Sequence, residues 1–319
     1  MAKFLVIRFS SIGDIVLCTP VFRHLKKQVL GGAEVHFLTK KNFAFLLEDN
    51  PYIDKTYSIE HSTHEVREDI KNEDYDFIID LHNNVRSRMI KRKTKVLDFT
   101  INKRNWEKWH WVNFGKNHLP DEHIVDRYMQ CISSFDIKND GEGLDYFIPE
   151  NQRVKCEGKF ISWAIGAAHP GKVMGKEKLS AILALIDMPI KLIGGPEDEI
   201  LGKEIESKFH HVESLAGQLN IHESASVIEQ SDLLITPDTG MMHIAAALQK
   251  KTLSYWGCTH PGLGMYPYMD SSKYRIVMPE GGRSKPCSKL GNRCKYDQKN
   301  PCPNQIDNRE FLNALDDLI

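Results

Sequence analysis

The sequence lacks any apolar run that approaches the roughly 20 residues needed to span a bilayer. It has no low-complexity segment and no internal repeat. Met1 to Val6 is too short for a secretion signal and leads directly into a strand pattern, so we expect no signal peptide. There is no excess of charge either, because the formal net charge is −1, and we expect no nucleic-acid partner. These absences predict a globular, cytoplasmic protein.

The seven cysteines are an odd number, and without a secretion signal we expect them to be reduced thiols. Three of them, Cys287, Cys294 and Cys302, lie in a tail that is rich in Gly, Pro and Lys. Their spacing is wide for a zinc knuckle, and the sequence offers no evident fourth ligand. We therefore expect no metal site, with a structural metal in this tail as the alternative.

The length of 319 residues favours two domains of roughly 150 residues each. Strand patterns alternate with helical patterns, which is typical of parallel sheets with crossover helices. The expected strands cover residues 4–8, 35–38, 77–81, 95–98, 161–165, 190–193, 232–236, 252–255 and 274–277. Residues 136–159 form a polar segment without a clear period, which predicts a linker near residue 150. We expect domains at residues 1–150 and 151–319, the second with a Cys-, Gly- and Pro-rich tail loop and a final helix from Asn308 to Ile319.

One apolar strand pattern ends at Asp238-Thr239-Gly240 and is followed by a helical pattern. At a helix N-terminus, free N–H groups and the positive end of the dipole favour a diphosphate, so Thr239 and Gly240 are candidate phosphate contacts. Asp238 is expected to order the turn or to lie on the ribose side, because a carboxylate repels a diphosphate. His243, one helical turn further on, is a candidate donor to a phosphate oxygen, and a buried core histidine is the alternative.

The same strand-loop-helix unit is expected at the start of the chain. It has a strand at residues 4–8, a loop at residues 10–14 and an amphipathic helix from Ile15 to Lys27. Ser11 and Gly13 make this loop small enough for a ligand to approach its backbone. Two such strand-loop-helix units far apart in the chain predict two Rossmann-like lobes. In each lobe the loop is expected at the carboxyl ends of the strands of a parallel sheet.

A basic patch begins at Arg86, and three tryptophans follow it at residues 106, 109 and 111. This pattern suits an anionic partner or a membrane surface, and the alternative is a solvated helix face with core tryptophans. The candidate acceptor contacts are Arg86, Arg88, Lys91 and Arg92.

Five motifs together resemble glycosyltransferase family nine, the heptosyltransferases that add heptose from ADP-heptose to the inner core of lipopolysaccharide. The motifs are Arg8 to Pro20, Gly166 to Lys172, Leu192 to Glu199, the Asp238-Thr239-Gly240 loop with His243, and Tyr255 to Pro261. The resemblance covers nearly the whole chain. It implies an α/β protein of the GT-B fold, with two Rossmann-like doubly wound domains facing a central cleft. It also implies an inverting transfer without a metal or another cofactor, in which the second domain holds the nucleotide sugar.

The resemblance also implies roles for particular residues. Asp14 becomes the candidate general base, and the alternative is an aspartate that only favours the helix dipole. Lys172 matches the phosphate-binding lysine of the family, and an ordinary surface lysine is the alternative. The turn at Gly194, Gly195 and Glu197 is a candidate contact for adenine or ribose. His222 stands where the family often has an acidic residue, which puts the nucleotide contacts in question.

We therefore expect an enzyme that moves heptose, or a related sugar, from an ADP-sugar donor to an anionic lipopolysaccharide-type acceptor. Its expected place is the cytoplasm, with peripheral contact at the inner face of the membrane. A nucleotide-sugar epimerase of the GT-B fold and a nucleotide-sugar-binding protein without chemistry are the alternatives.

Overall fold

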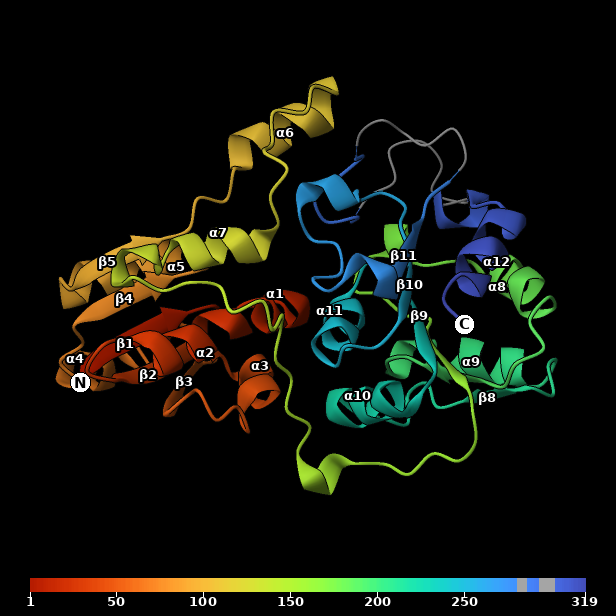
Figure 1. Cartoon of the computed structure of the whole chain (residues 1–319), viewed down its shortest axis with the longest axis horizontal. Helices are drawn as coiled ribbons and strands as arrows, with labels where there is room; N and C mark the ends of the chain where they lie inside the picture. Colours follow the sequence, from red (N-terminus) through yellow and green to blue (C-terminus); the bar gives the residue numbers. More distant parts are fainter. Residues whose placement is uncertain (280–285, 293–301) are drawn as a thin grey trace. The chain divides into compact units, whose positions relative to one another are not determined.

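The computed structural model describes residues 1–279, 286–292 and 302–319. The chain divides into two compact units (Figure 1). The first contains residues 1–103 and 122–147, and the second contains residues 104–121 and 148–319. Residues 104–121 thus make their contacts in the second unit, although they lie within the first 150 residues of the chain.

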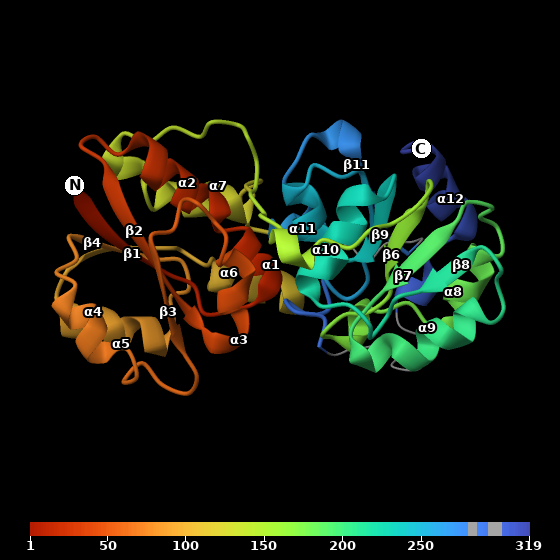
Figure 2. The ribbon, with the colours of Figure 1, turned by 90° about the horizontal axis from the view of Figure 1, so that it is seen from below.

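The first unit is built on a parallel sheet of five strands in the order β3-β2-β1-β4-β5. The strands are β1 (Ala2–Ile7), β2 (Ala33–Lys40), β3 (Lys55–Ile59), β4 (Phe77–Asp80) and β5 (Leu97–Thr100). The helices are α1 (Ile12–Val16), α2 (Thr19–Gln28), α3 (Lys41–Ala44), α4 (Arg67–Asn72), α5 (Val85–Thr94) and α7 (Ile124–Gln130). Figure 2 shows α2 and α7 on one face of the sheet and α4 and α5 on the other. Because both faces are covered, the central strand β1 is apolar along its buried length.

The second unit has a parallel sheet of six strands in the order β11-β10-β9-β6-β7-β8. The strands are β6 (Ile161–Ala164), β7 (Ile190–Ile193), β8 (Val212–Ser214), β9 (Leu233–Pro237), β10 (Thr252–Tyr255) and β11 (Tyr274–Val277). The helices are α6 (Asn105–Phe114), α8 (Lys176–Leu183), α9 (Glu199–Glu206), α10 (Ile221–Gln230), α11 (Gly240–Ala247) and α12 (Asn308–Asp316). In both units the chain starts in the middle of the sheet, moves to one edge and then returns, as in Rossmann folds. The expected doubly wound parallel sheets are confirmed.

Two local expectations were wrong, and two strands were missed. The helix expected from Ile15 to Lys27 is two helices, because Pro20 lies in the first turn of α2 and has no N–H to continue a helix from α1. The strand expected at residues 95–98 starts at Leu97, because Lys95 ends α5 in a left-handed conformation with φ 56°. The edge strands β3 and β8 were not expected, since they are short and partly exposed.

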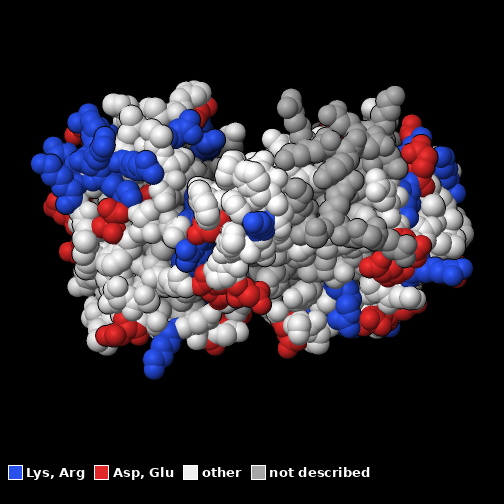
Figure 3. Space-filling model, turned by 90° about the horizontal axis from the view of Figure 1, so that it is seen from above, with Lys and Arg blue, Asp and Glu red and all other residues white. Residues whose placement is uncertain are grey.

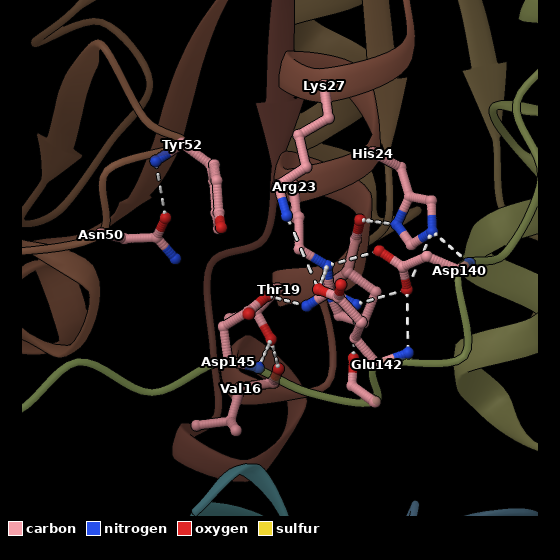
Figure 4. A network of polar contacts seen from close by, with 12 residues as sticks. Val16, Thr19, Arg23, His24, Lys27, Asn50, Tyr52, Asp140, Glu142 and Asp145 are labelled. Carbon is pink, nitrogen blue, oxygen red and sulfur yellow. Dashed lines mark hydrogen bonds and ion pairs between the residues drawn. The ribbon is translucent and has the colours of Figure 1, made fainter.

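The first part of the polar segment, up to Asp145, is fixed on α2 by the buried Arg23 (Figure 4). The guanidinium donates to both carboxylate oxygens of Asp140 at 2.9 Å and to the carbonyl of Gly143 at 2.8 Å, and it also pairs with Asp145. The ring of His24 accepts the backbone N–H of Asp140 at 3.0 Å. These contacts hold the polar segment on the first unit as far as Asp145, and the division between the two units falls after Phe147.

Within the described ranges, no helix is long and apolar enough to cross a membrane. Cys18, Cys131 and Cys156 have free thiols, and Cys294 of the expected tail cluster lies outside the described residues. The described groups that lie close enough together to share a metal ion are Glu34, His36 and Glu73. Two lysines already supply positive charge there, since the ammonium groups of Lys3 and Lys55 lie 2.9 and 2.5 Å from carboxylate oxygens of Glu73.

Candidate functional site

The candidate residues gather at the carboxyl ends of the central strands in each unit. In an open α/β sheet, the point where the strand order reverses leaves a crevice outside these ends, and ligands bind there. The reversal lies between β1 and β4 in the first unit and between β6 and β9 in the second. The loop with Asp14 follows β1, and the Asp238-Thr239-Gly240 loop follows β9.

In the first unit, both carboxylate oxygens of Asp14 have partners. Oδ1 lies 2.6 Å from the guanidinium of Arg8, and Oδ2 accepts the backbone N–H and the hydroxyl of Ser11 at 3.2 and 2.9 Å. Ser11 is the N-cap of α1, and Asp14 is the third residue of that helix, so the pair closes a capping box. The Asp14 side chain is 21% exposed, which leaves it accessible to a ligand.

Arg8 sets the electrostatics of this loop. It is buried, and its guanidinium also donates to the carbonyl of Leu81 at 2.6 Å and to the hydroxyl of Tyr128 at 3.0 Å. Burial disfavours the charged form of Asp14, but the charge of Arg8 and the hydrogen bonds from Ser11 outweigh it and hold the pKa of Asp14 below its ordinary value. Asp14 is therefore an anion at neutral pH.

His82 lies near this pair and stays neutral. Burial, together with the positive charge of Arg8, lowers the pKa of His82 to about 3. Its Nδ1 accepts the backbone N–H of Phe9 at 3.3 Å. Neither Arg8 nor His82 was given a role from the sequence. Arg8 directly follows β1 and His82 lies two residues after β4, and a position at the end of a central strand is the signal that could have marked them.

In the second unit, Lys172 meets the Asp238-Thr239-Gly240 loop. Its ammonium lies 2.7 Å from Oδ2 of Asp238 and donates to the carbonyl of the same residue at 2.8 Å. The hydroxyl of Thr259 donates to the same carboxylate at 2.8 Å. Asp238 thus orders this turn and holds Lys172 beside it. The role of Thr259 was not foreseen, because 21 residues separate it from Asp238.

The loop leads into α11 with Thr239 at the N-cap and Gly240 as the first helical residue. The Thr239 hydroxyl lies 3.2 Å from the hydroxyl of Thr236. The backbone N–H groups of the first helical turn have no partner inside a helix, so this end of α11 is suited to bind an anion. His243 lies in the first turns of α11 and is 2% exposed, as expected for a core histidine.

The turn after β7 carries Gly194, Gly195 and Glu197. It is closed by Asp198, whose carboxylate accepts the N–H of Gly195 at 2.9 Å. A Cβ at Gly166, in the loop after β6, would lie 1.9 Å from this carboxylate, so only glycine fits there. Asp198 therefore ties the ends of β6 and β7 together, while the Glu197 side chain is exposed.

His222 is the second residue of α10 and is 8% exposed. Its backbone N–H donates to the side chain of the N-cap residue Asn220 at 2.9 Å. The carboxylate of Glu223 accepts the N–H of Asn220 at 2.8 Å, which completes a capping box. The acidic residue beside His222 is thus engaged by its own helix.

Lys and Arg side chains gather on the first unit where α5 lies (Figure 3). Arg86, Arg88 and Arg92 are exposed. Lys91 differs from these three arginines, because its ammonium lies 2.8 Å from Asp98 and 3.2 Å from the buried Asp80. Lys91 thus stabilises the first unit itself, while the three arginines stay accessible to an anionic ligand.

Comparison with known proteins identifies relatives along the whole chain. A model described as glycosyltransferase family 9 (heptosyltransferase) matches residues 63–295. Lipopolysaccharide heptosyltransferase 1 of Campylobacter coli is 23% identical, over 99% of this chain and 99% of the relative. Lipopolysaccharide heptosyltransferase 1 of Escherichia coli K12 is 22% identical, over 82% of this chain and 89% of the relative.

Solved structures show the same fold. A glycosyl transferase of family 9 from Veillonella parvula has a TM-score of 0.78 at 18% identity, and the match covers 99% of this chain and 97% of that one. The E. coli heptosyltransferase WaaC with ADP has a TM-score of 0.73 at 18% identity, over 99% of this chain and 100% of that one. The expected GT-B fold is thereby confirmed.

Proposed function

Because the chain belongs to glycosyltransferase family 9, the heptosyltransferases, we propose that it transfers heptose, or a related sugar, from an ADP-sugar to a lipopolysaccharide core acceptor. The relatives that match most of the chain are lipopolysaccharide heptosyltransferases. The structural observation that carries the proposed donor site is the contact of Lys172 with the Asp238-Thr239-Gly240 loop at the end of β9.

The second unit is proposed to hold the nucleotide sugar. The N-terminus of α11, with Thr239 and Gly240, supplies backbone donors for the diphosphate. Lys172 uses two of its three ammonium donors on Asp238, which leaves one for a phosphate oxygen. These groups offset the charge that grows on the diphosphate as the bond to the sugar breaks, so the proposed transfer needs no divalent cation.

The adenosine part is proposed to lie along the ends of β7 and β8. Gly194 and Gly195 form the turn at this place, and the exposed Glu197 beside them is a candidate acceptor for ribose hydroxyls. His222, which follows β8 on α10, is proposed to border this site. His243 lies on α11, and its ring N–H is the proposed donor to a phosphate oxygen.

The first unit is proposed to supply the general base. Asp14 takes the proton of an acceptor hydroxyl while that oxygen attacks the anomeric carbon from the face opposite the diphosphate. The new glycosidic bond forms as the bond to the diphosphate breaks, and ADP leaves. The configuration at the anomeric carbon of the transferred sugar is inverted. Ser11 and Gly13 keep the loop small at this point, and Arg8 keeps Asp14 ionised.

The acceptor is proposed to be anionic. The exposed guanidinium groups of Arg86, Arg88 and Arg92 suit phosphates or acidic sugars, which they can bind through two hydrogen bonds each. A lipid acceptor would also bring the enzyme to the inner face of the cytoplasmic membrane as a peripheral protein.

The experiment that tests the proposal is calorimetric binding of ADP, UDP and GDP in EDTA and then in magnesium. ADP should bind best, and EDTA should not weaken it. Transfer from ADP-heptose to a lipopolysaccharide core acceptor, with the anomeric configuration of the product read by NMR, then tests the chemistry. A preference for UDP or GDP, a strict need for magnesium, or a product with retained configuration would contradict the proposal.

Two controls separate the alternatives. Incubation with nucleotide sugar but no acceptor should leave the sugar unchanged, whereas an epimerase would convert it. A protein that binds ADP tightly but transfers nothing to any core acceptor would be a binding protein, and the proposed role of Asp14 would then be wrong.

A further inference from the structure

Helix α6 exposes an unusual group of aromatic side chains. Trp106 is 62% exposed, Trp109 is 49% exposed and Phe114 is 60% exposed. Because a helix turns by about 100° per residue, these three side chains lie on one side of α6 together with His110. Scattered exposed apolar residues need no explanation, but several large rings on one helix face mark an interaction site.

The opposite side of α6 is attached to the second unit. Trp111 is 3% exposed, and its ring meets the ring of His260 edge-on with centroids 4.9 Å apart. A Cβ at Gly262 would come within 2.8 Å of the Trp111 ring, so the helix lies close against this loop. The ammonium of Lys289 donates to the carbonyl of Asn105 at 3.3 Å. The outer rings are therefore not needed to hold α6 in place.

The outer rings contact one another. Trp106 stacks on His110 with centroids 5.2 Å apart and on His118 at 6.4 Å. Trp109 meets Phe114 edge-on at 5.4 Å. We call these five side chains, Trp106, Trp109, His110, Phe114 and His118, the aromatic face. Its rings are ordered before any partner arrives, so binding costs little side-chain entropy.

The segment that carries the aromatic face has an excess of positive charge. The segment from residue 103 to residue 118 contains four basic residues and one acidic residue, a formal net charge of +3, whereas the whole chain carries −1. The basic residues are Lys103, Arg104, Lys108 and Lys116. The acidic residue, Glu107, pairs with Arg104 at 3.3 Å. An anionic surface is therefore the complementary partner.

We propose that the aromatic face enters the headgroup region of a membrane that carries anionic lipids. Tryptophan rings prefer this region, because they have an apolar body and a polar N–H, and lysines and arginines beside them attract anionic headgroups. This inference goes beyond the transfer reaction and does not depend on its chemistry. It gives the enzyme a binding surface of its own for the membrane in which a lipid acceptor resides.

The test is flotation of the full chain with vesicles of phosphatidylcholine alone and with about one third phosphatidylglycerol. The wild type should bind the anionic vesicles and should bind the neutral ones much more weakly. The double variant W106S/W109S should bind the anionic vesicles about tenfold more weakly or worse, because two large apolar rings are lost. Brominated lipids should quench tryptophan emission in the wild type, which checks the contact without any variant.

The matched control is the double variant L185S/I200S, which also removes two exposed apolar side chains from the second unit, 53% and 75% exposed. It should bind vesicles like the wild type. ADP binding should be equal in all three proteins, so a failed transfer reaction and a failed membrane contact give different results. The proposal is overturned if the wild type ignores anionic vesicles, if it binds neutral vesicles equally well, or if W106S/W109S binds as the wild type does.

Discussion

The guanidinium of Arg8 and the carboxylate of Asp14 form a 2.6 Å ion pair at the end of β1. The same guanidinium donates to the carbonyl of Leu81, directly after β4, so one side chain ties the loop of Asp14 to both central strands of the first unit. The pair keeps Asp14 oriented and ionised, but it also lowers the basicity of the carboxylate. Arg8 is thus a positioning residue for the proposed base.

Replacing Asp14 by Asn should lower turnover by roughly two to four orders of magnitude, the loss expected when a general base is removed. Asn keeps an oxygen that can accept from Ser11, so the loop should keep its shape. Calorimetry should show unchanged ADP binding, because the donor contacts lie in the second unit. Normal transfer by Asp14→Asn would rule out the proposed base.

Replacing Arg8 by Met should shift the pH profile. In the wild type the pKa of Asp14 lies below its ordinary value of 3.8, so the base stays ionised throughout the neutral range and into mild acid. Without Arg8, burial dominates and the pKa rises, so the acidic limb of kcat should move to higher pH. Measuring kcat against pH separates this shift of the acidic limb from a structural defect. A structural defect would lower kcat at every pH and would leave the position of the acidic limb unchanged.

Replacing Lys172 by Met should weaken ADP binding and lower turnover by roughly two to three orders of magnitude, because a charge beside the diphosphate is lost. The control is Lys203→Met, since Lys203 lies on α9, is 61% exposed and pairs with Glu199 in its own helix. Titration calorimetry and initial rates measure both effects. Equal ADP affinity in Lys172→Met and the wild type would remove Lys172 from the donor site.

Replacing Arg23 by Met should lower the free energy of unfolding by about 1.5–3 kcal/mol, because a buried guanidinium and its charged hydrogen bonds to Asp140 and Asp145 are lost. The matched control lies on the same helix. Lys26→Met removes a partly exposed pair with Asp54 and should cost about 1 kcal/mol or less. Urea unfolding measures both, and similar losses would mean that the Arg23 cluster does not hold the segment.

The Arg23 cluster should also make the first unit sensitive to acid. Burial opposes the charge of Asp140, but its hydrogen bonds with Arg23 outweigh this and lower its pKa to about 2, from an ordinary 3.8. A carboxylate whose pKa is lowered by folding stabilises the folded state fully at pH values above its pKa in the unfolded chain. This stabilisation is lost as the pH falls towards 2. Between neutral pH and pH 2, the free energy of unfolding should therefore fall more steeply in the wild type than in Arg23→Met.

The two strand-loop-helix units could be predicted from the sequence because their signals are local. Apolar runs such as Leu233–Pro237, a turn of small and polar residues, and a helical period all lie within a few residues of one another. The edge strands β3 and β8 escaped notice, because a short, half-exposed strand has no continuous apolar run. Helix α1 was missed as a separate element, since only Pro20 marks the break.

The sequence by itself determined the fold class, the family and the loops on which the candidate residues lie, because these follow from local patterns and motif order. The tertiary structure decided which charges meet. Lys172 and Asp238 are 66 residues apart, and Arg23 and Asp140 are 117 apart, and only the sheet order and the path of the chain bring them together. A buried charge needs a partner, but spacing along a chain does not reveal which one. The tertiary structure also assigned α6 to the second unit. It buried Trp111 against His260 and left Trp106 and Trp109 exposed.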